Sequence, residues 1–149
     1  MNLSGIVFTG RLKGFLFGPD WHLKQEVESN NLVVTVGLQH IVDQIYSVPA
    51  QGKMSHYAIG TGVTAPVAGD TTLQTEIARV ALDNQIRSGV DLIYSAVFLP
   101  GIGTGTLTEG GIFNAGSNGV MLARTTFTAV VKAAADTFIV THKITATGS

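Results

Sequence analysis

The stretch TLTEGGIFNAGSNGVMLARTTF, residues 106–127, decides how the rest of the chain is interpreted. Short apolar runs at Ile112-Phe113 and at residues 120–123 flank the sequence GSNG, residues 116–119, whose residues tolerate positive φ angles. This pattern predicts two β-strands joined by a four-residue turn. Such a turn sets three cross-strand pairs: Gly111 with Arg124, Phe113 with Leu122, and Ala115 with Val120.

The predicted register also places two opposite charges on one face of the hairpin, because Glu109 then lies diagonal to Arg124. An exposed pair at such positions contributes about 0.2–1 kcal/mol, whereas a buried pair matters more for register than for stability. We hypothesise that Glu109 and Arg124 pair with each other and fix the register of the hairpin. The alternative, a solvated hairpin with two unrelated charges, stays open on spacing alone.

The composition favours one domain whose surface is partly covered by other subunits. The chain has 149 residues, enough for a sizeable core without staples. Hydrophobic residues make up 45% and charged residues only 13%, against roughly 25% charged in an ordinary soluble protein. So few charges leave little to cover a free surface, which favours association with neighbouring subunits.

Several classes of function are disfavoured by the same composition. The net charge is −1 and the basic residues are scattered, unlike the basic stripe of a nucleic-acid binder. The absence of cysteine excludes disulfides, thiolate metal sites and a cysteine nucleophile. No apolar run reaches the roughly 18 residues of a transmembrane helix, and the N-terminus lacks the order of a signal peptide. We therefore expect neither a nucleic acid nor a membrane as partner.

Residues 35–46 are the best helix candidate, because their apolar residues recur at three- and four-residue spacing. Thr35 is the expected N-cap, and Val48-Pro49 should end the helix, since a residue before proline avoids the α region. The expected core-facing residues are Leu38, Ile41, Val42, Ile45 and Tyr46. The expected outer face carries Gln39, His40, Asp43 and Gln44.

Elsewhere the sequence favours strands separated by glycine-rich turns. Residues 137–147 alternate with period two, which is typical of a half-buried strand. Its expected inward face is Phe138, Val140, His142 and Ile144. Further strands are expected over residues 54–60, 77–82 and 92–98. The spacing predicts a mainly β fold, an antiparallel β-sandwich or jelly-roll-like domain with one α-helix near residues 35–46.

The N-terminal 30 residues look different from the remainder. Glycines interrupt residues 3–18, and residues 21–31 read as a polar connection, so we expect an extended attachment arm over residues 1–30 and a single β-rich domain over 31–149. Phe15, Phe17 and Trp21 are the expected apolar anchors of this arm on a partner. The alternative places the apolar run Phe15–Phe17 in the core.

No catalytic, cofactor-binding or metal-binding residues are predicted. The sequence GIGTGTLTEGG, residues 101–111, lacks the Gly-Lys-Ser/Thr of a phosphate loop and does not open a helix. No serine lies in a G-x-S-x-G elbow, Asp70 is interpreted as a turn cap, and Glu76 should pair locally with Arg79. The histidines are too far apart in sequence to indicate a metal site: His22, His40, His56 and His142.

Several short motifs occur in a characteristic order. They are YAIGTG at residues 57–62, AGDTTLQTE at 68–76 followed by Arg79, EGGIFN at 109–114, GVMLAR at 119–124, and Lys132 with Asp136-Thr137 before the last strand. This order resembles a group of small structural proteins of tailed bacteriophages, labelled tail-fibre-like, minor structural or head-decoration proteins. The resemblance covers about residues 33–147, and it includes both Glu109 and Arg124.

The resemblance implies a β-rich, non-enzymatic virion component without cofactors, assembled in the host cytoplasm. The resemblance does not set the position on the particle. The first placement is a cement protein on the capsid surface that braces major capsid subunits, and the low charge and high apolar content favour a homotrimer. Phe15, Phe17 and Trp21, which lie outside the resemblance, are the expected capsid contacts. The compact chain, without a long coiled coil or repeats, agrees with this placement. One alternative is a tail-fibre or baseplate module. Another is a carbohydrate-binding module, for which only Trp21, His22 and Tyr57 offer suitable side chains.

Overall fold

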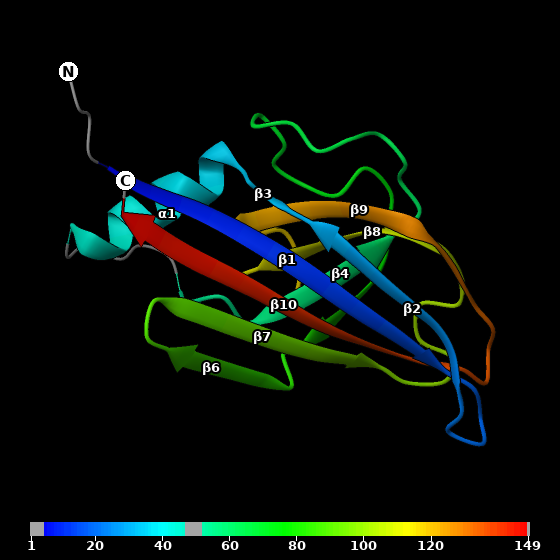
Figure 1. Ribbon diagram of the computed structural model, residues 1–149. Helices are drawn as coiled ribbons and strands as arrows, with labels where there is room; N and C mark the ends of the chain where they lie inside the picture. The colour runs from blue at the N-terminus through cyan, green and yellow to red at the C-terminus, as the bar shows by residue number, and fades with distance from the viewer. Residues whose placement is uncertain (1–4, 47–51, 149) are drawn as a thin grey trace.

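The computed structural model describes residues 5–46 and 52–148. These residues form two five-stranded antiparallel sheets that pack face to face as a β-sandwich (Figure 1). Sheet A contains, in order, β2 (Leu23–Asn30), β1 (Ile6–Phe17), β10 (Thr137–Gly148), β7 (Asp91–Phe98) and β6 (Asn84–Ser88). Sheet B contains β3 (Leu32–Val33), β9 (Met121–Lys132), β8 (Gly105–Phe113), β4 (His56–Gly60) and β5 (Glu76–Ala81). The predicted mainly β fold is confirmed.

The core lies between the two sheets and is filled by alternate residues of each strand. In β10 the predicted inward face is buried: Phe138, Val140, His142 and Ile144. From sheet B, Tyr57 and Ile59 of β4 pack into the same cluster. The period-two pattern therefore identified the buried face of this strand correctly.

The β8–β9 hairpin follows the expected register only in part. Gly111 does pair with Arg124, as predicted. A β-bulge after Ile112 then shifts the register, so that Phe113 pairs with Met121 and not with Leu122. The predicted pairing of Phe113 is therefore wrong by one residue.

The connection between β8 and β9 spans residues 114–120 and is longer than the predicted four-residue turn. The N–H of Asn114 donates to the carbonyl of Val120, so Ala115 does not take the position opposite Val120. Positive φ angles occur at Asn118 (53°) and Gly119 (74°), within the predicted turn sequence. Arg79 holds the loop from β5 by donating to the carbonyls of Ala115 and Asn118, at 2.9 Å each.

The expected N-terminal arm is part of sheet A. β1 pairs with β10 from Ile6 to Phe17 and with β2 on its other side (Figure 1). Leu12 and Leu16 of β1 lie in the core. The division into an arm over residues 1–30 and a domain over 31–149 is therefore corrected, because residues 6–30 form two strands of the sandwich. Residues 21–31, expected as a polar connection, instead contain β2, an edge strand.

Helix α1 (Thr35–Ile45) forms where the sequence predicted it, although its cap and its orientation differ. The N-cap is Val34, and no side chain caps the helix, so Thr35 does not play the predicted role. Val48 and Pro49, expected to end the helix, lie outside the described residues. Four of the five residues expected to face the core are exposed: Leu38, Val42, Ile45 and Tyr46.

The orientation of α1 follows from its contact with β9. Gly37 is buried against the backbone of Leu122, and a Cβ at this position would collide with the Leu122 carbonyl. This close approach turns Gly37 and His40 inward and the apolar stripe outward. The helix thus packs through its small residue, and the prediction of its buried face is wrong.

Candidate functional site

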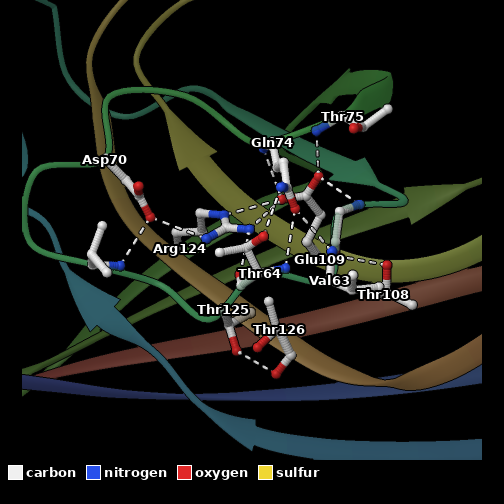
Figure 2. A network of polar contacts seen from close by, with 12 residues as sticks. Val63, Thr64, Asp70, Gln74, Thr75, Thr108, Glu109, Arg124, Thr125 and Thr126 are labelled. Atoms are coloured by element: carbon white, nitrogen blue, oxygen red, sulfur yellow. Dashed lines mark hydrogen bonds and ion pairs between the residues drawn. The ribbon is translucent and has the colours of Figure 1, made fainter.

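The most extensive polar network surrounds Glu109 of β8, within the residues that the structure describes (Figure 2). Its Oε1 accepts hydrogen bonds from the backbone N–H groups of Gly62 (3.0 Å) and Thr75 (2.7 Å). Its Oε2 accepts one from the N–H of Gln74 (3.0 Å). These donors belong to the two ends of the loop between β4 and β5, residues 61–75, which we call the braced loop.

Arg124 of β9 completes the network from the neighbouring strand. Its Nε and Nη2 lie 3.0 Å and 2.9 Å from Glu109 Oε2, so the two predicted partners contact each other. Its Nη1 also lies 3.0 Å from Asp70 Oδ2, and Nη2 donates to the carbonyl of Thr64. Both of these further partners belong to the braced loop, Thr64 near its start and Asp70 farther along it (Figure 2). The role of the pair in setting the hairpin register stays a prediction.

The pair is almost fully removed from solvent. Glu109 is 0% exposed and Arg124 is 2% exposed. Burial by itself would raise the pKa of Glu109, but the three backbone N–H groups and the guanidinium of Arg124 outweigh it and lower that pKa. The carboxylate is therefore ionised at neutral pH. Both of its oxygens accept hydrogen bonds, so it can hold the loop in place.

The space around the carboxylate is made by glycines. A Cβ at Gly62 would lie 2.5 Å from Glu109 Oε1, and a Cβ at Gly60 would meet the backbone of Thr75. The motif YAIGTG therefore supplies backbone room and a donor for Glu109. Asp70 also caps its own turn by accepting from the N–H of Val67, as the sequence predicted. Sequence spacing gave no signal for its additional contact with Arg124, which is 54 residues away.

What this network does physically is hold the braced loop in one conformation. Gln74 adds to it, because its Oε1 accepts from the N–H groups of Val63 and Thr64. The loop nevertheless presents the side chains of Val63 and Val67 to solvent. A fixed loop with exposed apolar side chains has the properties of a contact surface.

The three predicted contact residues lie on β1 and the β1–β2 turn. Phe15 and Phe17 are half-buried, and Trp21 is 64% exposed with a φ of 63°. The rings of Phe17 and Trp21 pack with centroids 6.1 Å apart. Phe15 and Phe17 have the same parity on β1 and alternate with the buried Leu12 and Leu16, so they face away from the sandwich core.

The residues considered for glycan binding are not brought together. Trp21 and His22 are exposed at the β1–β2 turn, where His22 contacts Asp20. Tyr57 is buried in the core instead, with its hydroxyl 2.9 Å from Nδ1 of His142. The structure therefore offers no aromatic platform built from these three side chains.

Metal and membrane features are also absent from the part of the chain that the structure describes. Among residues 5–46 and 52–148, no three His, Asp or Glu side chains are grouped closely enough to hold a metal ion. No helix in these ranges has the length and apolar character needed to cross a membrane. A cavity of about 380 Å³ beneath α1 is lined mainly by apolar side chains, such as Ile41, Met54 and Ile144.

The outward stripe of α1 is the second candidate contact surface. We call the residues Leu38, Val42, Ile45 and Tyr46 the helix stripe; each is between 41% and 77% exposed. Their spacing of three and four residues places them on one side of the helix. No charged residue belongs to the stripe, so it is an apolar surface without a partner among the described residues.

The comparisons with known proteins give no assignment: no family model, no curated protein and no solved structure matches the chain. The function is therefore inferred from the residues themselves and from their arrangement.

Proposed function

We propose that the chain is a non-enzymatic structural protein of a tailed-bacteriophage virion that self-associates and cements major capsid subunits on the capsid surface. The order of the motifs between residues 57 and 137 is the basis for the virion assignment. One structural observation favours a binding role, namely that α1 presents the helix stripe to solvent and packs on β9 through Gly37.

The helix stripe supports this proposal because an amphipathic helix normally turns its apolar side towards the core. A helix that does the opposite leaves apolar area exposed, at a cost that contact with another protein removes. The braced loop adds a second exposed apolar feature, at Val63 and Val67, whose conformation is held by the Glu109 network. Both features suit a protein whose role is to contact other subunits.

A tail-fibre or baseplate position is the second candidate function. The pair of Phe17 and Trp21 favours it, because it places exposed aromatic surface at the β1–β2 turn, away from α1 in Figure 1. Exposed aromatic side chains are frequent anchors at protein interfaces. A protein that links two different virion components needs two separate contact surfaces of this kind.

Cryo-electron microscopy of phage particles assembled in cells that produce this chain tests the proposal. The expected result is density for the sandwich on the head, with α1 against a major capsid subunit. Density on the tail would instead support the second candidate. Particles that lack the chain altogether would overturn both assignments.

A further inference from the structure

One end of β1 has an unpaired backbone edge. β10 pairs with β1 along Ile6–Phe17, whereas β2 pairs with it only from Arg11 to Phe17. We call residues 6–10 the β1 overhang. The carbonyl of Gly10 accepts from the N–H of Asn31 on this edge. Because backbone groups alternate in direction along a strand, the N–H and C=O groups of Phe8 and Ile6 point the same way. No strand formed by residues 5–46 or 52–148 pairs with them on this side.

The space beside this edge is open and uncharged. It forms a groove of about 600 Å³. None of the lining residues carries a charge: Ile6, Val7, Phe8, Thr9, Gly10, Asn30, Asn31, Leu32, Val33 and Leu38. The side-chain amide of Asn31 is buried there, and neither its oxygen nor its nitrogen has a hydrogen-bond partner among the residues that the structure describes. Natural edge strands are usually blocked by charges, proline or a bulge, and the overhang has none of these.

The opposite edge of sheet A is also available. It is formed by β6, whose five residues are all exposed; among the described strands, β6 pairs with β7 alone. Gln85 pairs with the buried Tyr94 and so lies on the core side of the sheet, which puts Ile86 on the outer side. Ile86 is 48% exposed, and Val7, on the outer side of the β1 overhang, is 49% exposed.

We propose that copies of this chain associate head to tail, with the β1 overhang of one copy paired to β6 of the next. This inference rests on the self-association in the proposed function and deepens it by naming the two surfaces. Three antiparallel steps separate β1 from β6 in sheet A, so the two strands run in opposite directions. A rotation about an axis to which the strands are tilted keeps the two strands antiparallel across the contact. A rotation that divides a full turn evenly then closes the head-to-tail contacts into a ring.

The faces of the two strands determine the pairing between copies. Matching outer side chains with outer side chains sets Val7 opposite Ile86, and core-side Phe8 opposite Gln85. The backbone of Val7 points towards β10, so Val7 and Ile86 form a non-hydrogen-bonded pair with Cα atoms about 4.5 Å apart. Phe8, whose backbone groups are unpaired, then forms the hydrogen-bonded pair with Gln85. The contact thus satisfies the free edge and covers two exposed apolar side chains.

The register requires a stagger between neighbouring copies. Within one copy, Ile86 is level with Arg11, through its pairing with Ile93 and that of Ile93 with Lys143. Pairing Ile86 with Val7 of the next copy shifts the strands by about four residues, or roughly 13 Å. Closed sheets need such a stagger, because their strands tilt relative to the axis. The offset is therefore compatible with a ring.

Cysteine cross-linking tests this contact, since the chain has no cysteine of its own. Val7→Cys and Ile86→Cys in one chain should form intermolecular disulfides on mild oxidation, because the expected Cα separation suits a disulfide. Non-reducing electrophoresis should show a series of bands that ends at one closed oligomer. The matched control combines Val7→Cys with Val131→Cys, an exposed valine of sheet B, and should stay uncross-linked.

The single-cysteine variants separate head-to-tail pairing from a two-fold contact. Each alone should give no cross-link, and a mixture of the two should give dimers only. Self-cross-linking of Val7→Cys would overturn the proposal, because it would show that two overhangs meet each other. A monomer in light scattering would overturn it too. An oligomer that does not cross-link would overturn the edge contact but leave the proposed function standing.

A second variant checks the backbone itself. Ile6→Pro removes an N–H that points to the free edge and leaves the bonds to β10 intact, whereas Ile6→Thr keeps this N–H. The proline variant should dissociate at least about tenfold more readily than the threonine variant, and equal association of the two would contradict edge pairing. The two tests can disagree. If the chain forms cross-linked rings but is missing from virions, the edge contact is supported and the proposed function is wrong.

Discussion

Glu109 supports more of the structure than Arg124 does, which gives the two residues unequal predicted effects. Glu109 accepts three backbone N–H groups besides its contact with Arg124. Glu109→Gln places an amide NH2 among these donors, and Arg124→Met leaves the carboxylate with its backbone donors. We expect both variants to lose about 3–5 kcal/mol of unfolding free energy, with the larger loss for Glu109→Gln. Urea unfolding of each variant measures these losses.

The double variant distinguishes a coupled pair from two independent residues. If the side chains stabilise each other, the double variant should lose less than the sum of the two single losses. Asp70→Asn is the matched control, because the Asp70 side chain is 22% exposed and its contact with Arg124 should contribute at most about 1 kcal/mol. Strictly additive losses for Glu109 and Arg124 would contradict the pairing hypothesis.

His142 should make the stability of the sandwich depend on pH. Its burial lowers the pKa of the imidazole to about 3, from an ordinary value near 6.5. Between these values the unfolded chain binds a proton that the folded chain does not, so this contribution is complete above pH 6.5 and is lost as the pH falls towards 3. The expected slope is about 1.4 kcal/mol per pH unit.

The matching variant is His142→Gln, which retains a polar partner for the hydroxyl of Tyr57 and does not titrate. Its unfolding free energy should fall less steeply than that of the natural chain between pH 6 and 5. Burial also lowers the pKa of His40, which stays in the variant and accounts for part of the remaining slope. Equal slopes for both proteins would show that His142 is not buried in its neutral form.

At the level of single residues, sequence spacing predicted contacts between residues close together in the sequence and missed contacts between residues far apart in it. The diagonal of Glu109 and Arg124 was predictable, because both lie within one hairpin. The same is true of Glu76 and Arg79, which form an ion pair three residues apart. The contact of Asp70 with Arg124 depends on the path of the braced loop, which no local pattern encodes. The backbone donors to Glu109 were unpredictable for the same reason.

Among the elements, α1 owes its orientation to Gly37. Alanine is the better helix former by about 1 kcal/mol, but its Cβ would collide with the carbonyl of Leu122. We therefore expect Gly37→Ala to destabilise the protein by about 1–3 kcal/mol. Chemical denaturation measures this loss. Gln39→Ala, on the exposed part of the same helix, should change stability by less than about 0.5 kcal/mol, and a stabilising Gly37→Ala would contradict the close contact.

β1 should be indispensable for folding. Deleting residues 1–30 removes β1 and β2, exposes the edge of β10 and takes Leu12 and Leu16 out of the core. We expect the truncated chain to lack a cooperative thermal transition in near-UV circular dichroism. The full-length Phe17→Ala/Trp21→Ala variant should keep that transition, because it changes side chains outside the core. If the truncated chain folds, residues 1–30 are an attachment arm and not part of the folded core.

The helix and the edge strands show where sequence patterns fail at the level of elements. Periodicity located α1 within a residue at each end, but it does not reveal which side of a helix meets the sheet. β2 and β6 carry mostly polar side chains because edge strands are exposed, so neither has the apolar alternation that identified β10. The central strands were predictable because the core imposes that alternation.

In the whole molecule, exposed apolar surface occurs in several places, two of which adjoin at the groove that Val7 and Leu38 both line. The helix stripe lies on α1, Val63 and Val67 lie on the braced loop, and Val7 and Ile86 lie at the two edges of sheet A. Only 13% of the residues are charged, so charge repulsion does little to prevent these apolar surfaces from binding other proteins. Light scattering at micromolar concentration should therefore give a discrete oligomer, with three times the chain mass as the expected value. A monomer would argue against a role as cement.

The last prediction is that self-association and attachment to the virion depend on different residues, although Leu38 of the helix stripe also lines the groove beside the β1 overhang. Val42→Lys with Ile45→Lys adds two charges to the helix stripe, where the replaced side chains are exposed and contribute little to folding. The oligomer mass in light scattering should stay unchanged, because the edge contact involves β1 and β6. Decoration of particles that lack the chain should fall at least about tenfold, since burying an unpaired charge in an interface is costly. Ile6→Pro should have its larger effect on the oligomer mass and its smaller effect on the decoration of particles. If the lysine variant becomes a monomer while Ile6→Pro keeps its oligomer mass, the prediction is wrong. The helix stripe of α1 would then mediate self-association, and the edge of β1 would mediate attachment to the virion.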